Sequence, residues 1–311
     1  MDVMVLAGGL SHERDVSMRS GRRVQEELRD AGLKVSLHDV DSSLIPTLRS
    51  RSDVVVWPML HGASGEDGSL QGLLELLDVP YVGTRAREAR VAWVKSVAKA
   101  VFARDGIATP EYVTLPQSLF REVGAEHVID AIVERIGLPL VVKPARGGSA
   151  LGVTLVTERE SMSRALVHCF AYGDTALVEA AVTGTEVAVS VLGTGADAEA
   201  LPGVEITAEG AYDYDARYNP GRVEYFSPAR LSEADASTVA ETALAVHRNL
   251  GLRDLSRVDI ILDDTGNAQV IDVNVTPGLT ETSLLPQAVE ASGRALGDVY
   301  TSIARAAFDR K

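Results

Sequence analysis

The chain has 311 residues, about twice the usual length of one domain, so its length predicts two or three domains. Hydrophobic residues make up 46% and charged residues 24%, a globular composition that excludes a disordered or fibrous protein. The net charge is −14 and no continuous basic stretch is present, so nucleic acid is not an expected partner. A single cysteine, Cys169, excludes an intrachain disulfide and a cysteine-only zinc site, and its apolar neighbours favour a buried structural thiol over a nucleophile.

The chain carries no recognisable targeting signal. Its N-terminus is acidic, and the apolar run there is too short for a secretory signal. One of the longest apolar runs, 54–60, is far short of the roughly 18 residues that a membrane helix needs. We therefore expect a cytoplasmic protein with no membrane partner.

Strands and helices alternate in the first third of the chain. The predicted strands cover 3–7, 34–39, 53–58 and 79–82, and the predicted helices cover 18–31 and 70–77. Strands joined through helices imply right-handed crossovers and a parallel, doubly wound sheet.

Predicted strands and helices continue through the middle and last thirds of the chain. After a long predicted helix over 88–105, the middle third predicts strands over 112–114, 138–143, 153–156 and 176–179, with helices over 125–135 and 161–171. The last third predicts strands over 186–192, 200–206, 257–262 and 268–273, with helices over 237–250 and 288–308. A polar, tyrosine-rich segment over 209–221 has the composition of a surface loop that serves as a lid.

Two polar loops follow predicted strands of the first sheet. Ligands gather at the carboxyl ends of parallel strands, where the loop 8–14 places Glu13. Glu13 either binds an ammonium group or, as an acid at a helix start, stabilises the helix dipole. The loop 61–72 holds His61 and four glycines, and this dense polar setting favours a ligand site over a structural histidine.

A glycine-rich loop, 145–152, follows Lys143 and leads into another predicted strand. Small residues let backbone N–H groups approach phosphate oxygens, and Lys143 adds a charge beside them. The spacing fits neither the Walker A motif nor the dinucleotide fingerprint. We expect a hairpin flap over phosphates, although an ordinary hairpin turn remains the alternative.

A fourth constellation spans two neighbouring predicted strands near the C-terminus. A period of two places Arg257 with Asp259, and Asp272 with Asn274, on one face of the two strands. Two carboxylates and an amide oxygen suit Mg²⁺, and Arg257 could stabilise developing negative charge. A solvated polar face is the alternative.

These four segments, in this order, resemble the D-alanine–D-alanine ligases of the ATP-grasp superfamily over nearly the whole chain. The most specific segments are HGASGEDGSLQG at 61–72 and NVTPGLTETSLLP at 274–286. The resemblance implies an α/β fold in which a doubly wound N-terminal domain, 1–93, precedes a central ATP-grasp lobe, 94–181, and a C-terminal lobe, 182–311. The implied reaction phosphorylates one D-alanine carboxylate with ATP, and a second D-alanine amine then attacks the acylphosphate to give D-alanyl-D-alanine for peptidoglycan synthesis.

The resemblance also implies roles for individual residues. For the first D-alanine it implies Glu13 at the ammonium, Ser149 and Tyr218 as its hydrogen-bonding partners, and His61 near the carboxylate. Arg257 and Gly278 resemble oxyanion stabilisers, while Glu66, Asp67, Ser283 and Leu284 resemble residues that bind the second substrate. The implied ATP-binding residues are Lys95, Lys143, Gly148, Glu179, Val182, Glu186 and Arg217, and the implied ligands of two Mg²⁺ or Mn²⁺ ions are Asp259, Asp272 and Asn274. The family is usually homodimeric.

Several positions depart from the usual family pattern. The chain has Val94, Ala150, Ala180, Asp272 and Val275 where the family commonly has aspartate, serine, lysine, glutamate and threonine, and Arg217 replaces lysine. These changes leave open an ATP-grasp ligase for other amino acids or, less favoured, a nucleotide-binding paralogue without catalysis. Tyr218 argues against a D-alanine–D-lactate ligase, which typically has histidine in that loop.

Overall fold

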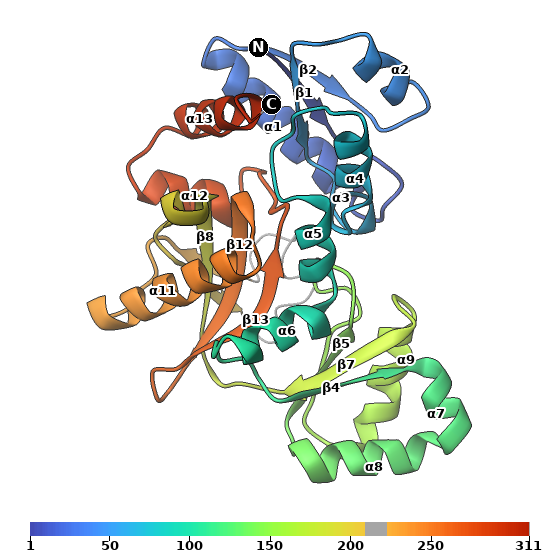
Figure 1. Cartoon of the computed structure of the whole chain (residues 1–311). Coiled ribbons are helices and arrows are strands. Elements are labelled where there is room, and N and C mark those ends of the chain that lie inside the picture. Colours follow the sequence, from blue (N-terminus) through green and yellow to red (C-terminus); the bar gives the residue numbers. More distant parts are fainter. Residues whose placement is uncertain (209–222, 311) are drawn as a thin grey trace.

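The computed structural model describes residues 1–208 and 223–310, and it arranges them as three sheets with flanking helices (Figure 1). The sheets have three, six and four strands. The α/β class expected from the sequence is confirmed.

The N-terminal part is a parallel sheet with strand order β2-β1-β3. Its elements are β1 (Asp2–Leu6), α1 (Arg14–Asp30), β2 (Lys34–His38), α2 (Leu44–Arg49), β3 (Val54–Pro58), α3 (Ala63–Glu66), α4 (Ser69–Leu76) and α5 (Ala86–Trp93). Every residue of β1 is buried, because Val3 and Val5 face α1 whereas Met4 and Leu6 face α2 and α4. Helices therefore cover both faces, as a doubly wound sheet requires.

The central part is an antiparallel sheet with strand order β4-β7-β5-β6. Its elements are α6 (Lys95–Arg104), β4 (Tyr112–Pro116), α7 (Gln117–Val123), α8 (Ala125–Ile136), β5 (Leu140–Pro144), β6 (Thr154–Val156), η1 (Arg159–Ser161), α9 (Met162–Phe170) and β7 (Thr175–Ala180). α8 and α9 pack on one face, where Cys169 is fully buried and burial raises the pKa of its thiol to about 12. The thiol is therefore a buried structural group and not a nucleophile, as the sequence indicates.

The C-terminal part is an antiparallel sheet with order β11-β10-β8-β12-β13, to which β9 adds at β8. Its elements are β8 (Gly184–Thr194), η2 (Gly195–Asp197), β9 (Glu199–Ala200), β10 (Val204–Ala208), β11 (Val223–Phe226), α11 (Glu233–Asn249), β12 (Arg253–Asp263), β13 (Ala268–Asn274), α12 (Leu284–Ala291) and α13 (Leu296–Phe308). The central and C-terminal sheets face each other across a cleft.

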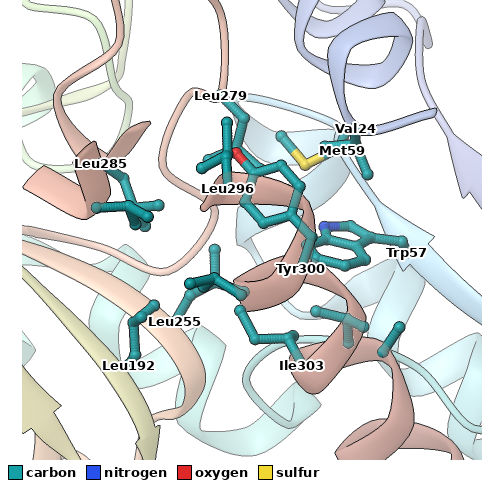
Figure 2. Close-up of a cluster of buried hydrophobic side chains, with 14 of the residues drawn as sticks. Val24, Trp57, Met59, Leu192, Leu255, Leu279, Leu285, Leu296, Tyr300 and Ile303 are labelled. Atoms are coloured by element: carbon teal, nitrogen blue, oxygen red, sulfur yellow. The ribbon is translucent and has the colours of Figure 1, made fainter. Parts of the chain in front are cut away.

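The first and last parts of the chain share a hydrophobic core (Figure 2). Tyr300 of α13 meets Trp57 of β3 edge to face, with ring centroids 5.3 Å apart. Leu255 of β12 and Met59 belong to the same cluster. This shared core fixes the N-terminal sheet against the C-terminal lobe, and it brings the loops after β1 and β3 up to the end of β13.

Four predicted elements differ from the structure. The helix predicted over 88–105 is two helices, α5 and α6, because Val94 is extended and bridges to Arg146. The helix predicted over 288–308 is also divided, since α12 ends at a turn where Gly293 has φ +75°. The strand predicted over 79–82 is only a bridge between Tyr81 and Val56, and the strand predicted over 200–206 is interrupted between β9 and β10.

Candidate active site

A cleft of about 1100 Å³ lies between the central and C-terminal sheets. Its apolar walls come from Val141, Leu155, Val182, Ile261 and Ile271, a lining that suits a flat aromatic base. The polar residues at its surface are Lys95, Lys143, Glu179, Glu186, Asp259 and Asp272. Six of the seven expected ATP-binding residues therefore lie here, namely Lys95, Lys143, Gly148, Glu179, Val182 and Glu186.

The glycine loop joins β5 to β6 as a hairpin and borders this cleft, as predicted. Two adjacent non-glycine residues in it, Ser149 and Ala150, have φ of +53° and +56°. L-residues rarely adopt this conformation, and pairs of strained residues concentrate at functional sites. Lys95 makes two hydrogen bonds to the loop. Its Nζ donates to the Gly147 carbonyl at 2.9 Å, and its backbone N–H donates to the Ala145 carbonyl at 3.0 Å.

Buried lysines flank the Glu179 carboxylate at the inner end of the cleft. Lys143 Nζ pairs with Glu179 Oε1, and Lys99 Nζ lies 2.8 Å from Oε2. Sequence reasoning missed Lys99, although its spacing of four residues from Lys95 on a predicted helix places both on one face. Burial lowers the pKa of Lys99 to about 8, against the opposing effect of Glu179.

The strands β12 and β13 pair as predicted. Arg257 lies opposite Asn274 and Asp259 opposite Asp272, so all four side chains project from one sheet face. The Arg257 guanidinium donates two hydrogen bonds, of 2.6 and 2.9 Å, to the Asp259 carboxylate. Lys95 Nζ donates to both Asp272 carboxylate oxygens at 3.0 Å. Each carboxylate is thus neutralised by a cation of the protein.

A second pocket, of about 610 Å³, adjoins the cleft. Glu13 immediately precedes α1 but makes no side-chain cap; instead its carboxylate accepts a hydrogen bond from Ser149 of the glycine loop. The alternative of a simple helix-capping acid is therefore disfavoured. Glu66 lines the same pocket, and burial followed by repulsion from Glu13 raises its pKa to about 8.

His61 lines this pocket too, but its ring nitrogens already have partners in the protein. Nδ1 lies 3.1 Å from the Thr276 carbonyl, which can only accept, so Nδ1 carries the hydrogen. Nε2 lies 3.4 Å from Ser20 Oγ. Burial lowers the pKa of His61 to about 4, so the ring is neutral at pH 7 and joins the loop after β3 to the loop after β13.

The far side of the pocket is formed by the loop from β13 to α12. Gly278, Ser283 and Leu284 line it, and Ser283 directly precedes α12. Ser283 Oγ accepts from the Thr280 N–H at 2.9 Å. A helix start next to the pocket favours a carboxylate, because its N–H groups and dipole are oriented toward an anion.

The other predicted site residues fall elsewhere. Asp67 is not among the lining residues of this pocket; it accepts from the Ser69 N–H at 2.7 Å and lines an adjoining groove that shares Glu13 and Gly148 with the pocket. Arg217 and Tyr218, with the predicted lid segment 209–221, lie outside the described residues.

Comparison with known proteins identifies the family. The family model for the D-ala D-ala ligase C-terminus matches residues 101–304, and that for the D-ala D-ala ligase N-terminus matches residues 37–84. A D-alanine–D-alanine ligase from Anaeromyxobacter sp. (strain K) is 39% identical over 302 residues, which cover 97% of this chain and 95% of that protein. The chain belongs to the D-alanine–D-alanine ligase family.

Other relatives extend the similarity over the full length. A D-alanine–D-alanine ligase from Pelotomaculum thermopropionicum is 35% identical and covers 99% of this chain and 97% of its own length. The structure of the VanG D-Ala:D-Ser ligase from Enterococcus faecalis superposes with a TM-score of 0.84 at 25% identity, over 98% of this chain and 99% of that one. The D-alanine–D-alanine ligase from Coxiella burnetii gives 0.83 at 26% identity, over 100% of this chain and 94% of that one.

The ATP-grasp fold and membership of an ATP-dependent ligase family are thereby confirmed for this chain. Within residues 1–208 and 223–310, no helix combines the length and apolarity needed to cross a bilayer.

Proposed function

We propose that this protein joins two D-alanine molecules into D-alanyl-D-alanine, with cleavage of ATP to ADP and phosphate, in the synthesis of peptidoglycan precursors. The observation that carries the proposal is the junction of the two cavities. Gly148 lines both of them, and Arg257 and Asn274 line the smaller one beside Asp272 of the larger. A terminal phosphate in the cleft and a carboxylate in the pocket would therefore meet where these residues adjoin.

The Glu13 carboxylate supports binding of the first amino acid. It is 6% exposed, lines the pocket and accepts from Ser149, and a carboxylate is the group that pairs with a substrate ammonium. With the ammonium at Glu13, a small amino acid extends its own carboxylate toward Arg257 and the glycine loop. We infer that Glu13 and Ser149 together orient this substrate for attack on the γ-phosphoryl group.

The two chemical steps then follow in order. A carboxylate oxygen of the first D-alanine attacks the γ-phosphorus of ATP, and the bond from that phosphorus to the β-phosphate oxygen breaks. ADP is the leaving group, and the first D-alanine becomes an acylphosphate. The amine of the second D-alanine attacks the acyl carbon, loses a proton, and expels phosphate as the amide forms. Arg257 and the Gly278 backbone are proposed to stabilise the oxyanion of the tetrahedral intermediate.

The second D-alanine is proposed to place its carboxylate at Ser283 and Leu284. The start of α12 offers N–H groups to that carboxylate, and both residues line the pocket. Glu66 lines the same pocket, and its Oε1 accepts from the Gly62 N–H at 3.0 Å. A largely protonated Glu66 adds little negative charge beside Glu13, which suits a pocket that takes two amino acids in turn.

The oxygen atoms on β12 and β13 fit Mg²⁺ or Mn²⁺. Within the described part of the chain, no three His, Cys, Asp or Glu side chains converge to hold a metal, so Asp259, Asp272 and Asn274 would share the ions with phosphate oxygens and water. Bound ions would neutralise charge on the transferring phosphate. We propose that Lys95, which pairs with Asp272 here, turns to the phosphates when the carboxylate takes a metal.

A product assay tests the proposal directly. The protein is incubated with ATP, Mg²⁺ and D-alanine, and in parallel with D-serine, D-lactate or L-alanine, and products are identified by mass spectrometry beside ADP release. We expect D-alanyl-D-alanine with one ADP per dipeptide. ATP binding without any dipeptide from D-alanine would contradict the proposal.

A D-alanine–D-serine ligase is the second candidate, because the chain superposes as well on the VanG D-Ala:D-Ser ligase, with a TM-score of 0.84, as on the D-alanine–D-alanine ligase from Coxiella burnetii, with 0.83. An equimolar mixture of D-alanine and D-serine separates the two, since each candidate predicts a different dominant dipeptide. The family resemblance also supports a homodimer, which light scattering at micromolar concentration tests.

A further inference from the structure

Lys99 is a buried lysine behind the nucleotide cleft. It is 2% exposed, and it is not among the residues that line the cleft. Burying an ammonium is costly unless several partners compensate. Lys99 Nζ meets the Glu179 carboxylate, donates to Thr109 Oγ1 at 2.5 Å and to the Pro110 carbonyl at 3.3 Å, and lies 4.9 Å from the centre of the Tyr112 ring.

The Glu179 carboxylate lies between two ammonium groups with different surroundings. Lys99 contacts Oε2 from behind the cleft, whereas Lys143 contacts Oε1 and itself lines the cleft. Lys143 also donates to the Ile271 carbonyl of β13 at 3.0 Å. Two lysines and one glutamate leave one positive charge in this array, and Lys143 and Glu179 both line the cavity whereas Lys99 does not.

Hydrogen bonds through Thr109 connect Lys99 to β13. α6 passes between β13 and the central sheet (Figure 1), and Thr109, which receives the Lys99 hydrogen bond, donates in turn to the Val270 carbonyl of β13 at 2.8 Å. Lys95, four residues earlier on α6, supports the glycine loop. One helix thus places Lys95 in the lining of the cleft and Lys99 behind it.

We propose that Lys99 is a positioning residue for nucleotide binding, which fixes the Glu179 carboxylate from the side away from the cleft and thereby sets the place of Lys143 at the phosphates. The proposal rests on ATP being the nucleotide of the proposed function. Without Lys99, the Glu179–Lys143 pair is neutral, and the Oε2 atom loses the partner that holds the carboxylate in one orientation. The cleft then offers less positive charge to an anionic nucleotide.

The test is the substitution Lys99→Met, which keeps the length of the side chain without its charge. We expect the KM for ATP to rise about tenfold while the KM for D-alanine stays within twofold. Thr109→Val is the matched control, since it removes a partner of Lys99 and the link to Val270 but leaves the Glu179–Lys143 contact. It should leave the KM for ATP within twofold, even if the melting temperature falls.

A double-mutant cycle separates positioning from simple structural support. If Lys99 acts through Glu179, Lys99→Met adds little to the ATP affinity already lost in Glu179→Gln. Fully additive losses, an equal rise in both KM values, or an unchanged KM for ATP would overturn the proposal. Should Lys99→Met not fold, Lys99→Gln, which keeps a donor toward Thr109, takes its place in the same cycle.

Direct binding of a non-hydrolysable ATP analogue distinguishes failure of this proposal from failure of the proposed function. Calorimetry reports nucleotide affinity whether or not a dipeptide forms, so the cycle remains decisive if the product proves different. Equal affinity of the wild type and Lys99→Met for the analogue would refute the role of Lys99 alone.

Discussion

Replacing Glu66 by glutamine should change stability in a way that depends on pH. The side chain is 7% exposed, and burial followed by the nearby Glu13 charge raises its pKa from 4.5 to about 8. Glutamine imitates the protonated acid, and its carbonyl oxygen can still accept from the Gly62 N–H. The variant should therefore match the wild type at low pH and exceed it at high pH.

The size of the effect follows from proton linkage. The folded protein holds the Glu66 proton more tightly than the unfolded chain does, so this contribution to stability is complete below pH 4.5 and is lost as the pH rises toward 8. The interval between the two pKa values, at about 1.4 kcal/mol per unit, corresponds to an upper limit of about 5 kcal/mol. For a chain of this size, each kcal/mol moves the melting temperature by about 2 °C.

The assay is thermal unfolding of the wild type and Glu66→Gln in matched buffers from pH 5 to pH 9. We expect near-equal melting temperatures at pH 5 and an advantage of several degrees for the variant at pH 9. Glu26→Gln, an exposed change on α1, is the control and should follow the wild type throughout. A constant difference between Glu66→Gln and the wild type across this range would refute the reasoning.

Four further predictions concern the site and its support. Glu13→Gln should raise the KM for D-alanine at least about tenfold with ATP affinity unchanged, because only the ammonium contact is lost; calorimetry with ATP and steady-state kinetics check it. Arg257→Lys should lower kcat by about 10²–10³, since lysine cannot reproduce the two hydrogen bonds to Asp259, and a loss below threefold would contradict the oxyanion role. Asp272→Asn should shift the Mg²⁺ titration of turnover to higher concentration without a loss of melting temperature; an unshifted titration would remove the metal assignment. Tyr300→Phe should unfold within about 1 kcal/mol of the wild type, because its buried hydroxyl makes no hydrogen bond to the described residues, whereas Trp57→Ala should cost about 3–5 kcal/mol in denaturant unfolding.

The proposed metal-binding and oxyanion-stabilising residues on β12 and β13 could be predicted from the sequence. Arg257, Asp259, Asp272 and Asn274 were predicted on neighbouring strands because their spacing of two and the intervening turn are local signals, and β12 and β13 pair them as expected. The partners of those carboxylates were not predicted. Lys95 reaches Asp272 from a helix 177 residues away in the chain, a contact without a periodic signal.

The division of the helix predicted over 88–105 has the same cause. Residues around Val94 carry ordinary helical propensity, and neither glycine nor proline marks a stop. The chain becomes extended there because Val94 pairs with Arg146 of the glycine loop. A tertiary contact thus outweighs local preference. The turn at Gly293, by contrast, had a local signal that the prediction of one helix overlooked.

The sequence by itself determined the class of fold, the family and the order of the loops that carry the site, because hydrophobic period, glycine placement and motif spacing are properties of short segments. Only the tertiary structure decided that His61 is neutral and engaged with Thr276, that Glu66 is protonated at neutral pH, and that Lys99 stands behind Glu179. Those properties depend on burial and on charges brought together from distant parts of the chain. Desolvation and pairing act through space, and no local pattern records them.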